Sequence, residues 1–369
     1  MTTEPAEFTV RRLDVAAYTI PTETPEADGT LSWTSTTMVL VHAHLAGGVT
    51  GLGYTYGPAA IAGVITDLLA ERVSGLDARD TGTAWQRMRD AVRNAGRPGL
   101  ASMAIAAVDI ALHDAKARAI GQPLHKVLGP VRDAVAVYGS GGFVNYSDRR
   151  LIDQLTDWVA AGIPRVKLKI GADRGSDWRE DLRRILLVRK EIGDDVELFV
   201  DANGCYDLTT ARIAGQAFAE RAGVSWFEEP VSSDDLDGLA ALSRLLPLDV
   251  AAGEYGYQLE YFHTMAAAVD VLQADITRCA GLTEWLRVAA VTQAAKLPLS
   301  AHCAPASHIA AATVPANLRH IEYFHDHVRI ERLLFDNLPS LRDGFLCPTS
   351  DPGNGLVFKA DTAQRYRVA

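Results

Sequence analysis

Residues 165–204 read RVKLKIGADRGSDWREDLRRILLVRKEIGDDVELFVDANG, and this stretch decides the fold. A short apolar run, RVKLKI, is followed by a helix-like segment and then by a second apolar run, ELFVDA. Ser176 is placed to cap the helix at its start, and Gly193 lies just past its end. A strand, a helix and a strand in this order predict two parallel strands joined by a right-handed crossover.

The same rhythm continues on both sides of this stretch. From about residue 134 the chain contains eight short apolar runs, most of them separated by helix-like segments: VAVYG, RVKLKI, ELFVDA, VSWFEE, LDVAAGE, VLQADI, LPLSAH and RHIEYF. Strands that alternate with helices form a parallel sheet, and eight such units close into a barrel. The sequence therefore predicts an α/β protein built on a TIM-type barrel.

The residues before and after the barrel follow different patterns. Residues 7–20 and 36–55 alternate as strands do, and helix-like stretches follow at 58–72, 81–95 and 100–119, which predicts a separate α+β domain. The turn-rich segment 21–33 is expected to be a mobile loop. We expect domains at 1–125 and 126–337, with a turn-rich segment, 338–369, packing back on the first domain.

Composition narrows the class of protein. Of the 369 residues 48% are apolar, and no run of them is long enough to span a bilayer. The opening MTTEPAEFTV has neither the basic nor the apolar region of a signal peptide, so none is expected. A net charge of −10 argues against general nucleic-acid binding. The four cysteines include no C-x-x-C pair, and a reducing cytoplasm is the expected location.

Ionisable side chains stand at the carboxyl ends of the predicted barrel strands, where the active sites of such barrels lie. They are spaced by 20 to 32 residues, or about one strand-helix unit, and are Lys169, Asp201, Glu228, Glu254, Asp275, His302 and Glu322. Successive strands should bring them around one mouth.

Three of these residues, Asp201, Glu228 and Glu254, are carboxylates on adjacent strands. Without a cation they would repel one another, and one would have to stay protonated. Carboxylate oxygens with water suit Mg²⁺, and Mn²⁺ would serve as a substitute. A single acid at such a position often only caps the next helix, but three at this spacing favour a metal site.

Lys167 and Lys169 lie two residues apart, so both point to one face of their strand. Val166, Leu168 and Ile170 form the opposite, helix-facing side, which places both lysines inside the barrel. Two neighbouring ammonium groups lower each other's proton affinity, and nearby carboxylates offset that effect. The pair is therefore a candidate for a general base.

Asp275 and His302 lie on neighbouring strands. A carboxylate that binds one imidazole nitrogen fixes the tautomer and raises the basicity of the other nitrogen, which makes the pair a candidate general acid or base. Glu322 ends the last strand, where an acid could donate a hydrogen bond to a substrate carboxylate as negative charge develops.

Several further residues receive weaker interpretations. Asn203 and Glu229 follow metal-site carboxylates and are expected to support them rather than to ligate. His325 and His327 are equally consistent with the pocket wall and with an ordinary loop. Cys303 adjoins His302, but strand neighbours face opposite sides, which argues against a Cys/His nucleophile. The run YGSGG at 138–142 lacks phosphate-loop spacing and is expected to be a strand-end turn.

Taken together, the motifs VKLKIG, VDANG, WFEEP, AAGE, QADITRCAG, LSAH and HIEYF resemble the enolase superfamily, and within it the mandelate racemase subgroup. The helix ALHDAKARAIGQPLHKVLG resembles the segment that links that family's capping domain to its barrel. The resemblance covers nearly the whole chain. One departure is Ala280-Gly281, where two glycines are frequent, and it concerns only the turn after Asp275.

The resemblance implies an α+β cap over a modified (β/α)7β barrel. It implies Asp201, Glu228 and Glu254 as Mg²⁺ ligands, Lys169 as the base on one face of the substrate, Lys167 as its modulator, and His302 with Asp275 on the opposite face. Glu322 matches the electrophilic acid. Mobile cap loops at about 20–33 and 50–58 would close the site over a small carboxylate substrate, and the family is often homo-oligomeric.

The implied shared step is removal of a proton α to a carboxylate to give an enediolate. Dehydration of a sugar-derived acid to a 2-keto-3-deoxy acid is the leading expectation, because it dominates the subgroup. Racemisation or epimerisation of a 2-hydroxy acid is the first alternative. A Schiff-base lyase and a catalytically idle binding barrel are the alternatives of other classes.

Overall fold

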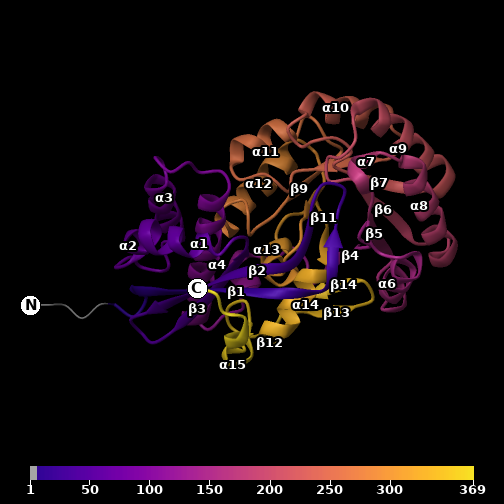
Figure 1. Ribbon diagram of the computed structural model, residues 1–369. Coiled ribbons are helices and arrows are strands. Elements are labelled where there is room, and N and C mark those ends of the chain that lie inside the picture. The colour runs from indigo at the N-terminus through magenta and orange to yellow at the C-terminus, as the bar shows by residue number, and fades with distance from the viewer. Residues whose placement is uncertain (1–5) are drawn as a thin grey trace, which may run out of the picture.

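The computed structural model describes residues 6–369 (Figure 1). The first five residues, which belong to the expected cap and to the segment examined for a signal peptide, lie outside the described residues. The cap opens with an antiparallel sheet of β1 (Val10–Ala27), β2 (Ser32–Leu45) and β3 (Thr50–Tyr56). The helical elements that follow are α1 (Ala60–Val64), the π-helical turn η1 (Ile65–Leu69), α2 (Ala70–Val73), α3 (Thr81–Ala91), α4 (Leu100–Ala119) and α5 (Leu124–Leu128). All three predicted cap helices are present.

The cap sheet lies directly against α4, and two glycines permit this contact. A Cβ atom at Gly51 would lie 2.2 Å from the Ala111 carbonyl oxygen, and one at Gly53 would lie 2.3 Å from that of Ala107. Helix α4 also contacts the barrel, because Asp109 accepts hydrogen bonds from the amide and hydroxyl of Thr283 at 2.8 and 2.7 Å. One helix thus joins the two domains.

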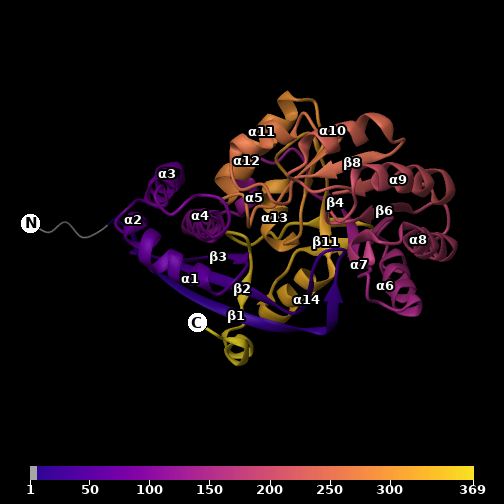
Figure 2. The ribbon, with the colours of Figure 1, turned by 45° about the horizontal axis from the view of Figure 1, so that its top comes forward.

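Eight parallel strands form the barrel, and pairing of the last with the first closes it (Figures 1 and 2). The strands are β4 (Val135–Gly141), β5 (Arg165–Lys169), β6 (Glu197–Asp201), β7 (Val224–Glu228), β8 (Asp249–Ala252), β9 (Val271–Ala274), β10 (Leu299–Ala301) and β11 (Leu318–Phe324). The eight predicted strands and the barrel fold are therefore confirmed.

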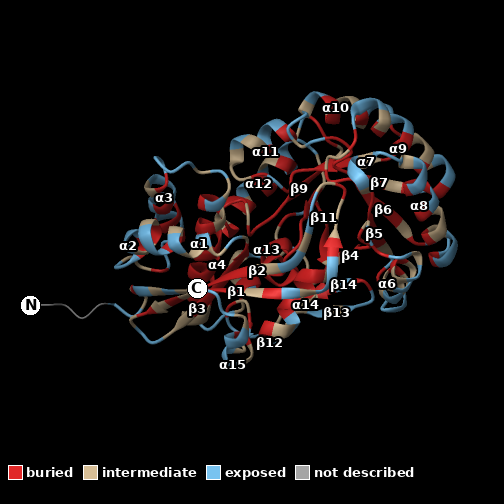
Figure 3. Cartoon of the chain, in the orientation of Figure 1, coloured by how far each residue is buried: buried red, intermediate tan, exposed pale blue. Residues whose placement is uncertain are grey.

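Helices surround the barrel, with buried inner faces and exposed outer faces (Figure 3). They are α6 (Asp148–Ala160), a short turn α7 (Ala172–Gly175), α8 (Trp178–Ile192), α9 (Leu208–Ala222), α10 (Leu236–Leu245), α11 (Leu259–Met265), α12 (Leu282–Ala294), α13 (Pro305–Ala312) and α14 (His325–Leu334). Within the described residues, no helix has the length and apolar character needed to cross a bilayer.

Inside the barrel, the inward side chains form two layers. The lower layer, called the barrel floor here, is buried and apolar, and consists of Tyr138, Phe199, Trp226, Ala251 and Val271. The Phe199 and Trp226 rings are stacked with centroids 5.3 Å apart. Each strand then continues by two residues on the same face, which places Asp201 above Phe199 and Glu228 above Trp226. The floor therefore supports a charged layer at the mouth.

The C-terminal segment contacts both domains. Strands β13 (Ser340–Arg342) and β14 (Phe345–Cys347) form a hairpin whose second strand pairs with β4. Strands β12 (Phe335–Asp336) and β15 (Val357–Phe358) pair with each other, and α15 (Ala360–Ala363) and the 3₁₀ turn η2 (Gln364–Tyr366) follow. The Ala17 amide donates to the Ala369 carbonyl at 2.9 Å. The exact domain boundaries remain predictions.

The two expected cap loops differ from the prediction. Strand β1 continues to Ala27, and β2 begins at Ser32, so only 28–31 form a turn. Prolines 21 and 25 suggested a loop, but a register shift between Pro21 and Glu26 accommodates them. Residues 50–56 likewise belong to β3. These segments pair with neighbouring strands in hairpins, Glu26 with Trp33 and Thr50 with His44, and the turn-forming residues of the sequence do not reveal how far the pairing extends.

The start of α8 also differs from the prediction. Asp177, not Ser176, caps the helix, and its side chain accepts from the amides of Arg179 and Glu180 at 3.1 and 3.4 Å. Asp173 and Arg174 adopt positive φ, which turns the chain one residue further before the helix begins. Gly193 ends the helix with φ 79°, as predicted.

Candidate active site

The structure brings all the predicted strand-end side chains together at one end of the barrel. Each is buried, and we call this set the mouth cluster: Lys167, Lys169, Asp201, Glu228, Glu254, Asp275, His302 and Glu322. Several of them line a cavity of about 360 Å³ between the barrel and the cap. The cap side of this cavity is formed by Asp28, Leu31, Trp33, Ser35, Thr36, Thr37 and Gly57.

Lys167 lies at the centre of three carboxylates. Its Nζ is 2.6 Å from Glu228 Oε1, 2.9 Å from Glu322 Oε1 and 3.3 Å from Asp201 Oδ2. Burial alone would lower its pKa, but Glu228 and Glu322 outweigh burial and raise the pKa well above its usual value. The ammonium group therefore compensates a concentration of negative charge that would otherwise be costly to bury.

Lys169 forms an ion pair with Asp201. Burial lowers the pKa of Lys169, but Asp201 raises it by more, while Lys167 again lowers it. The net result is a raised pKa. The expected lowering of the Lys169 pKa by Lys167 is thus present as one contribution, and the carboxylates exceed it.

The three carboxylates on β6 to β8 provide the oxygen-rich donor set that a hard divalent cation prefers. Burial and the neighbouring Asp201 raise the pKa of Glu228 to about 8. One oxygen each of Glu228 and Glu254 and one nitrogen of His302 lie within 4.8 Å of one another. Glu254 Oε2 has no hydrogen-bond partner among the described residues. Crowded, incompletely partnered carboxylates of this kind fit a divalent cation.

Asn203 and Glu229 lie beside this donor set with positive φ values of 46° and 39°. The backbone amide of Asn203 donates to Asp201 Oδ1 at 2.9 Å. Both side chains are buried, and within residues 6–369 neither Asn203 Oδ1 nor Glu229 Oε1 finds a hydrogen-bond partner. Burial and Glu254 raise the pKa of Glu229 well above its usual value. A supporting role for both residues remains a prediction.

His302 and Asp275 form a hydrogen-bonded pair across β10 and β9. His302 Nδ1 lies 2.8 Å from Asp275 Oδ2, while Asp275 Oδ1 accepts from the Thr277 amide and hydroxyl at 2.7 Å. Burial opposes a charge on His302, but Cys303, Glu254 and Glu322 raise its pKa well above the usual range. The carboxylate fixes the imidazole with Nε2 directed into the cavity.

Glu322 lies between the two candidate acid-base groups. Its Oε1 accepts from Ser140 Oγ at 2.5 Å and pairs with Lys167, while Oε2 accepts from the Cys303 amide at 3.1 Å. Burial would raise the pKa of Glu322, but Lys167 and His302 lower it below its usual range. The residue is therefore a carboxylate here, whereas the predicted hydrogen-bond donor would carry a proton.

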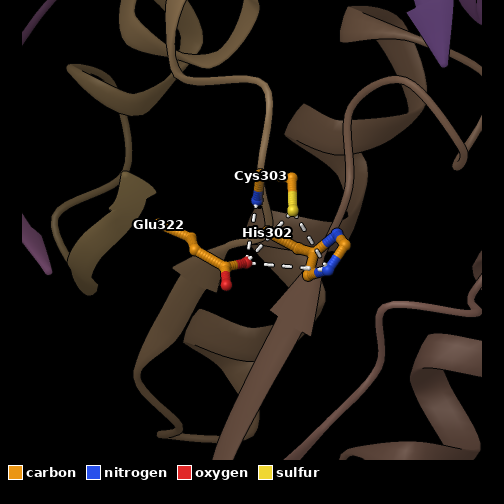
Figure 4. A group of neighbouring side chains, drawn as sticks. All are labelled: His302, Cys303 and Glu322. Atoms are coloured by element: carbon orange, nitrogen blue, oxygen red, sulfur yellow. Dashed lines mark hydrogen bonds and ion pairs between the residues drawn. The ribbon is translucent and has the colours of Figure 1, made fainter. Parts of the chain in front are cut away.

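The prediction that Cys303 and His302 face opposite sides of the strand was wrong. Its Sγ lies 3.4 Å from His302 Nε2 and 3.3 Å from Glu322 Oε2 (Figure 4). Strand β10 ends at Ala301, and Cys303 and Ala304 take φ values of 52° and 39°, so the alternation of a strand no longer applies. Burial and Glu322 raise the thiol pKa. No local sequence signal marks this turn.

Two further residues at the site escaped prediction. Arg278 Nη1 lies 3.2 Å from both Glu254 Oε1 and the Glu254 carbonyl oxygen, and its guanidinium covers the Tyr255 ring at 5.2 Å. Ser140, within the glycine-rich run that was expected to be a turn, belongs to β4 and holds Glu322. Arg278 lies three residues after Asp275 in the motif QADITRCAG, and this position just beyond a strand end was the sequence signal that could have identified it.

The two histidines after β11 have different surroundings. His327 lines the cavity and stacks on Tyr56 with ring centroids 3.5 Å apart. His325 Nε2 instead lies 3.6 Å from Glu23 of the cap hairpin. Ala280, the departure from the double glycine, adopts φ 66°, and the His302–Asp275 contact is retained.

Comparisons with known proteins agree with this architecture. Residues 150–362 match the family model for enolase C-terminal domain-like proteins, and residues 10–129 match the mandelate racemase/muconate lactonizing enzyme N-terminal domain. The 3,6-anhydro-alpha-L-galactonate cycloisomerase of Streptomyces coelicolor is 31% identical over 366 residues, which cover 97% of this chain and 99% of that protein.

Solved structures are similar over the whole length. A mandelate racemase/muconate lactonizing enzyme-like protein from Rubrobacter xylanophilus superposes with a TM-score of 0.95 and 49% identity, covering 98% of this chain and 100% of that one. L-talarate/galactarate dehydratase from Salmonella typhimurium, with Mg and L-lyxarohydroxamate, gives a TM-score of 0.90 and 26% identity over 100% and 95% of the chains. The chain therefore belongs to the enolase superfamily, in its mandelate racemase/muconate lactonizing enzyme subgroup.

Proposed function

We propose that this protein is a Mg²⁺-dependent dehydratase that converts a sugar-derived acid into a 2-keto-3-deoxy acid. The observation that carries the proposal is the arrangement of the mouth cluster. Three carboxylates lie together between a lysine on β5 and a histidine after β10, which approach the cavity from opposite sides of the barrel. One relative is a named dehydratase whose structure contains Mg and a sugar-acid hydroxamate.

Asp201, Glu228 and Glu254 would hold the cation, with Mn²⁺ as a substitute. When bound, it supplies Lewis-acid stabilisation of the substrate carboxylate. The same three side chains would then no longer raise the pKa of Lys169, while burial and Lys167 continue to lower it. Lys169 thus becomes suited to accept the α-proton of the substrate.

The remaining steps belong to the other side of the cavity. His302 is held by Asp275 with Nε2 directed inward, and Asp275 and Glu322 both favour a raised His302 pKa, so its protonated form can protonate the β-hydroxyl as that group leaves as water. The resulting enol tautomerises to the 2-keto acid. Glu322 faces the substrate carboxylate, and a neighbouring negative charge raises a carboxyl pKa, which favours the hydrogen-bond-donating form.

Racemisation or epimerisation of a 2-hydroxy acid is the second candidate, because two acid-base groups from opposite sides also allow proton return to the other face. A Schiff-base lyase would use Lys169 without requiring the three acids, and a binding-only barrel would require neither acid-base group. Borohydride trapping of Lys169 would support the lyase. Loss of activity on chelation would argue against it.

The test is a screen of aldonic, aldaric and uronic acids with Mg²⁺ in D₂O. NMR reports α-deuteration, and a semicarbazide assay reports the 2-keto product. We expect at least one acid to give keto product. Deuteration without keto acid would replace dehydration by racemisation or epimerisation, and no exchange with any acid would favour the binding-only barrel.

Two further parts of the proposal concern the protein as a whole. We expect a cytoplasmic homo-oligomer that acts on a small carboxylate. Light scattering after size exclusion measures the oligomeric state, and a monomer at micromolar concentration would contradict it.

A further inference from the structure

Three side chains at the end of β10 and on β11 form a compact group of different donor types. His302 Nε2, Cys303 Sγ and Glu322 Oε2 are separated by 3.4 Å (N to S), 3.3 Å (S to O) and 3.6 Å (N to O) (Figure 4). All three are buried at the cavity. The proposed reaction uses the imidazole and the carboxylate but assigns no task to the thiol.

These separations correspond to the edges of a tetrahedral zinc site. Zinc bonds of about 2.3 Å to sulfur, ~2.05 Å to nitrogen and ~2.1 Å to oxygen give donor separations of about 3.4 to 3.6 Å at tetrahedral angles. The three observed separations lie within about 0.3 Å of these values. The fourth position stays open, as in zinc sites that keep a water ligand.

The surroundings hold each donor in place. Histidines that ligate metals usually donate their other ring N–H to a carboxylate, and His302 Nδ1 meets Asp275 Oδ2 at 2.8 Å. Glu322 is fixed through its other oxygen by Ser140 and Lys167. Cys303 is directed inward by its left-handed backbone conformation.

We propose that His302, Cys303 and Glu322 form a second metal site, selective for Zn²⁺ and similar soft ions, whose occupation inhibits the enzyme. Thiolate and imidazole ligands favour zinc, whereas Mg²⁺ favours oxygen, so the two sites select different cations. On binding, the thiol and the imidazole Nε2 each release a proton to solvent, and no electron is transferred. Water or Glu254 Oε2, 3.3 Å from His302 Nε2, completes the coordination.

Inhibition follows because zinc occupies two groups that the reaction needs. His302 loses the proton that it would give to the leaving hydroxyl, and Glu322 loses its position against the substrate carboxylate. This consequence rests on the proposed function, whereas metal binding itself does not. The two are therefore measured separately.

The binding experiment uses the full-length chain in excess Mg²⁺. Zn²⁺ is titrated against a chromogenic chelator, and Co²⁺ is used as a spectroscopic substitute that reports sulfur ligation by a charge-transfer band. We expect one Zn²⁺ per chain and a sulfur-to-cobalt band. Cys303→Ser should abolish the band and weaken zinc binding at least about tenfold, since even outer partners of ligating histidines change affinity by that factor.

Cys347→Ser is the matched control, because Cys347 lies on β14 outside the cavity, and it should behave as wild type. Absence of the band in wild-type protein overturns the proposal without reference to any variant. Equal zinc affinity in wild type and Cys303→Ser also overturns it.

The activity experiment measures inhibition relative to the zinc-free rate of each protein. Wild type and Cys347→Ser should be inhibited at the same low zinc concentration, and Cys303→Ser should require at least about ten times more. Equal inhibition of all three would place the inhibitory zinc elsewhere and overturn the inhibitory role. If no acid is turned over, the proposed function fails while the binding experiment still decides the metal site.

Discussion

The barrel floor and the mouth cluster are neighbouring buried layers, and on β6 and β7 their residues lie two positions apart on the same strand, yet the interactions within each layer differ. Phe199 and Trp226 stack on each other, so their main contacts are between aromatic rings. Asp201 and Glu228, one layer above, are crowded carboxylates that depend on Lys167. The difference teaches that the floor contributes packing stability, whereas the mouth cluster holds crowded negative charges that a bound cation would neutralise.

The largest expected effect is at the proposed base. Lys169→Ala should lower kcat about 10⁴-fold, because the variant lacks the proposed acceptor of the α-proton and Lys167 is held by three carboxylates. Turnover and α-deuterium exchange on the best substrate of the screen provide the measurement. Lys190→Ala, on the exposed face of α8, is the control and should be fully active. Retained exchange in Lys169→Ala would assign the base elsewhere.

The opposite side of the mouth should show a different pattern. His302→Asn should lower keto-acid formation about 10³-fold, since the leaving hydroxyl loses its acid, while α-deuteration from the Lys169 side continues. NMR in D₂O separates the two outcomes. His263→Asn, on the exposed side of α11, is the matched control. Full activity of His302→Asn would refute the role of the His302–Asp275 pair.

The floor should respond in stability rather than in chemistry. Phe199→Ala removes a fully buried ring and should cost about 3 kcal/mol of unfolding free energy. Denaturant titration measures this loss, and kcat of the folded fraction should change far less than in the mouth variants. Phe345→Ala, at a half-exposed position, should stay within about 0.5 kcal/mol. An equal cost at both positions would contradict the floor's structural role.

The smallest effect tests the contact between the layers. Trp226 Nε1 donates to Glu228 Oε2 at 3.1 Å, so Trp226→Phe keeps a ring in the floor but removes this hydrogen bond. We expect Mg²⁺ affinity to fall about tenfold, with kcat at saturating Mg²⁺ nearly unchanged. Calorimetric titration of Mg²⁺ gives the affinity. Trp178→Phe is the control, and identical affinities in both variants would show that the layers act independently.

Much of this comparison was predictable from sequence because it rests on local periodicity. The eight barrel strands and their polar ends follow from short apolar runs of even spacing. The shared inward face of Lys167 and Lys169 follows from the two-residue repeat of a strand. The ionisation of these lysines was not predictable. It depends on distances of about 3 Å to carboxylates on other strands, which spacing along the chain does not provide.

Two other features required the folded chain. Cys303 leaves strand geometry through two consecutive residues with positive φ, and neither residue is a glycine that would have signalled the turn. The hairpin tip pairs Glu26 with Trp33 across the turn, although its two prolines indicated a loop. In both places the folded chain adopts a conformation that local propensity would not favour.

Helix α4 has a mechanical consequence. The cap sheet contacts it without intervening side chains at Gly51 and Gly53, and Asp109 fastens it to α12 of the barrel. Sheet, helix and barrel therefore form a stiff frame, from which the β1–β2 hairpin extends as a lever over the cavity. Two hydrogen bonds hold the tip of this lever on the barrel: the Ala27 carbonyl accepts from the Val144 amide at 2.9 Å, and the Pro25 carbonyl accepts from the Asn145 side chain at 2.7 Å. The register is irregular between Pro21 and Glu26, so we expect backbone amides there to exchange with solvent faster than those of the frame.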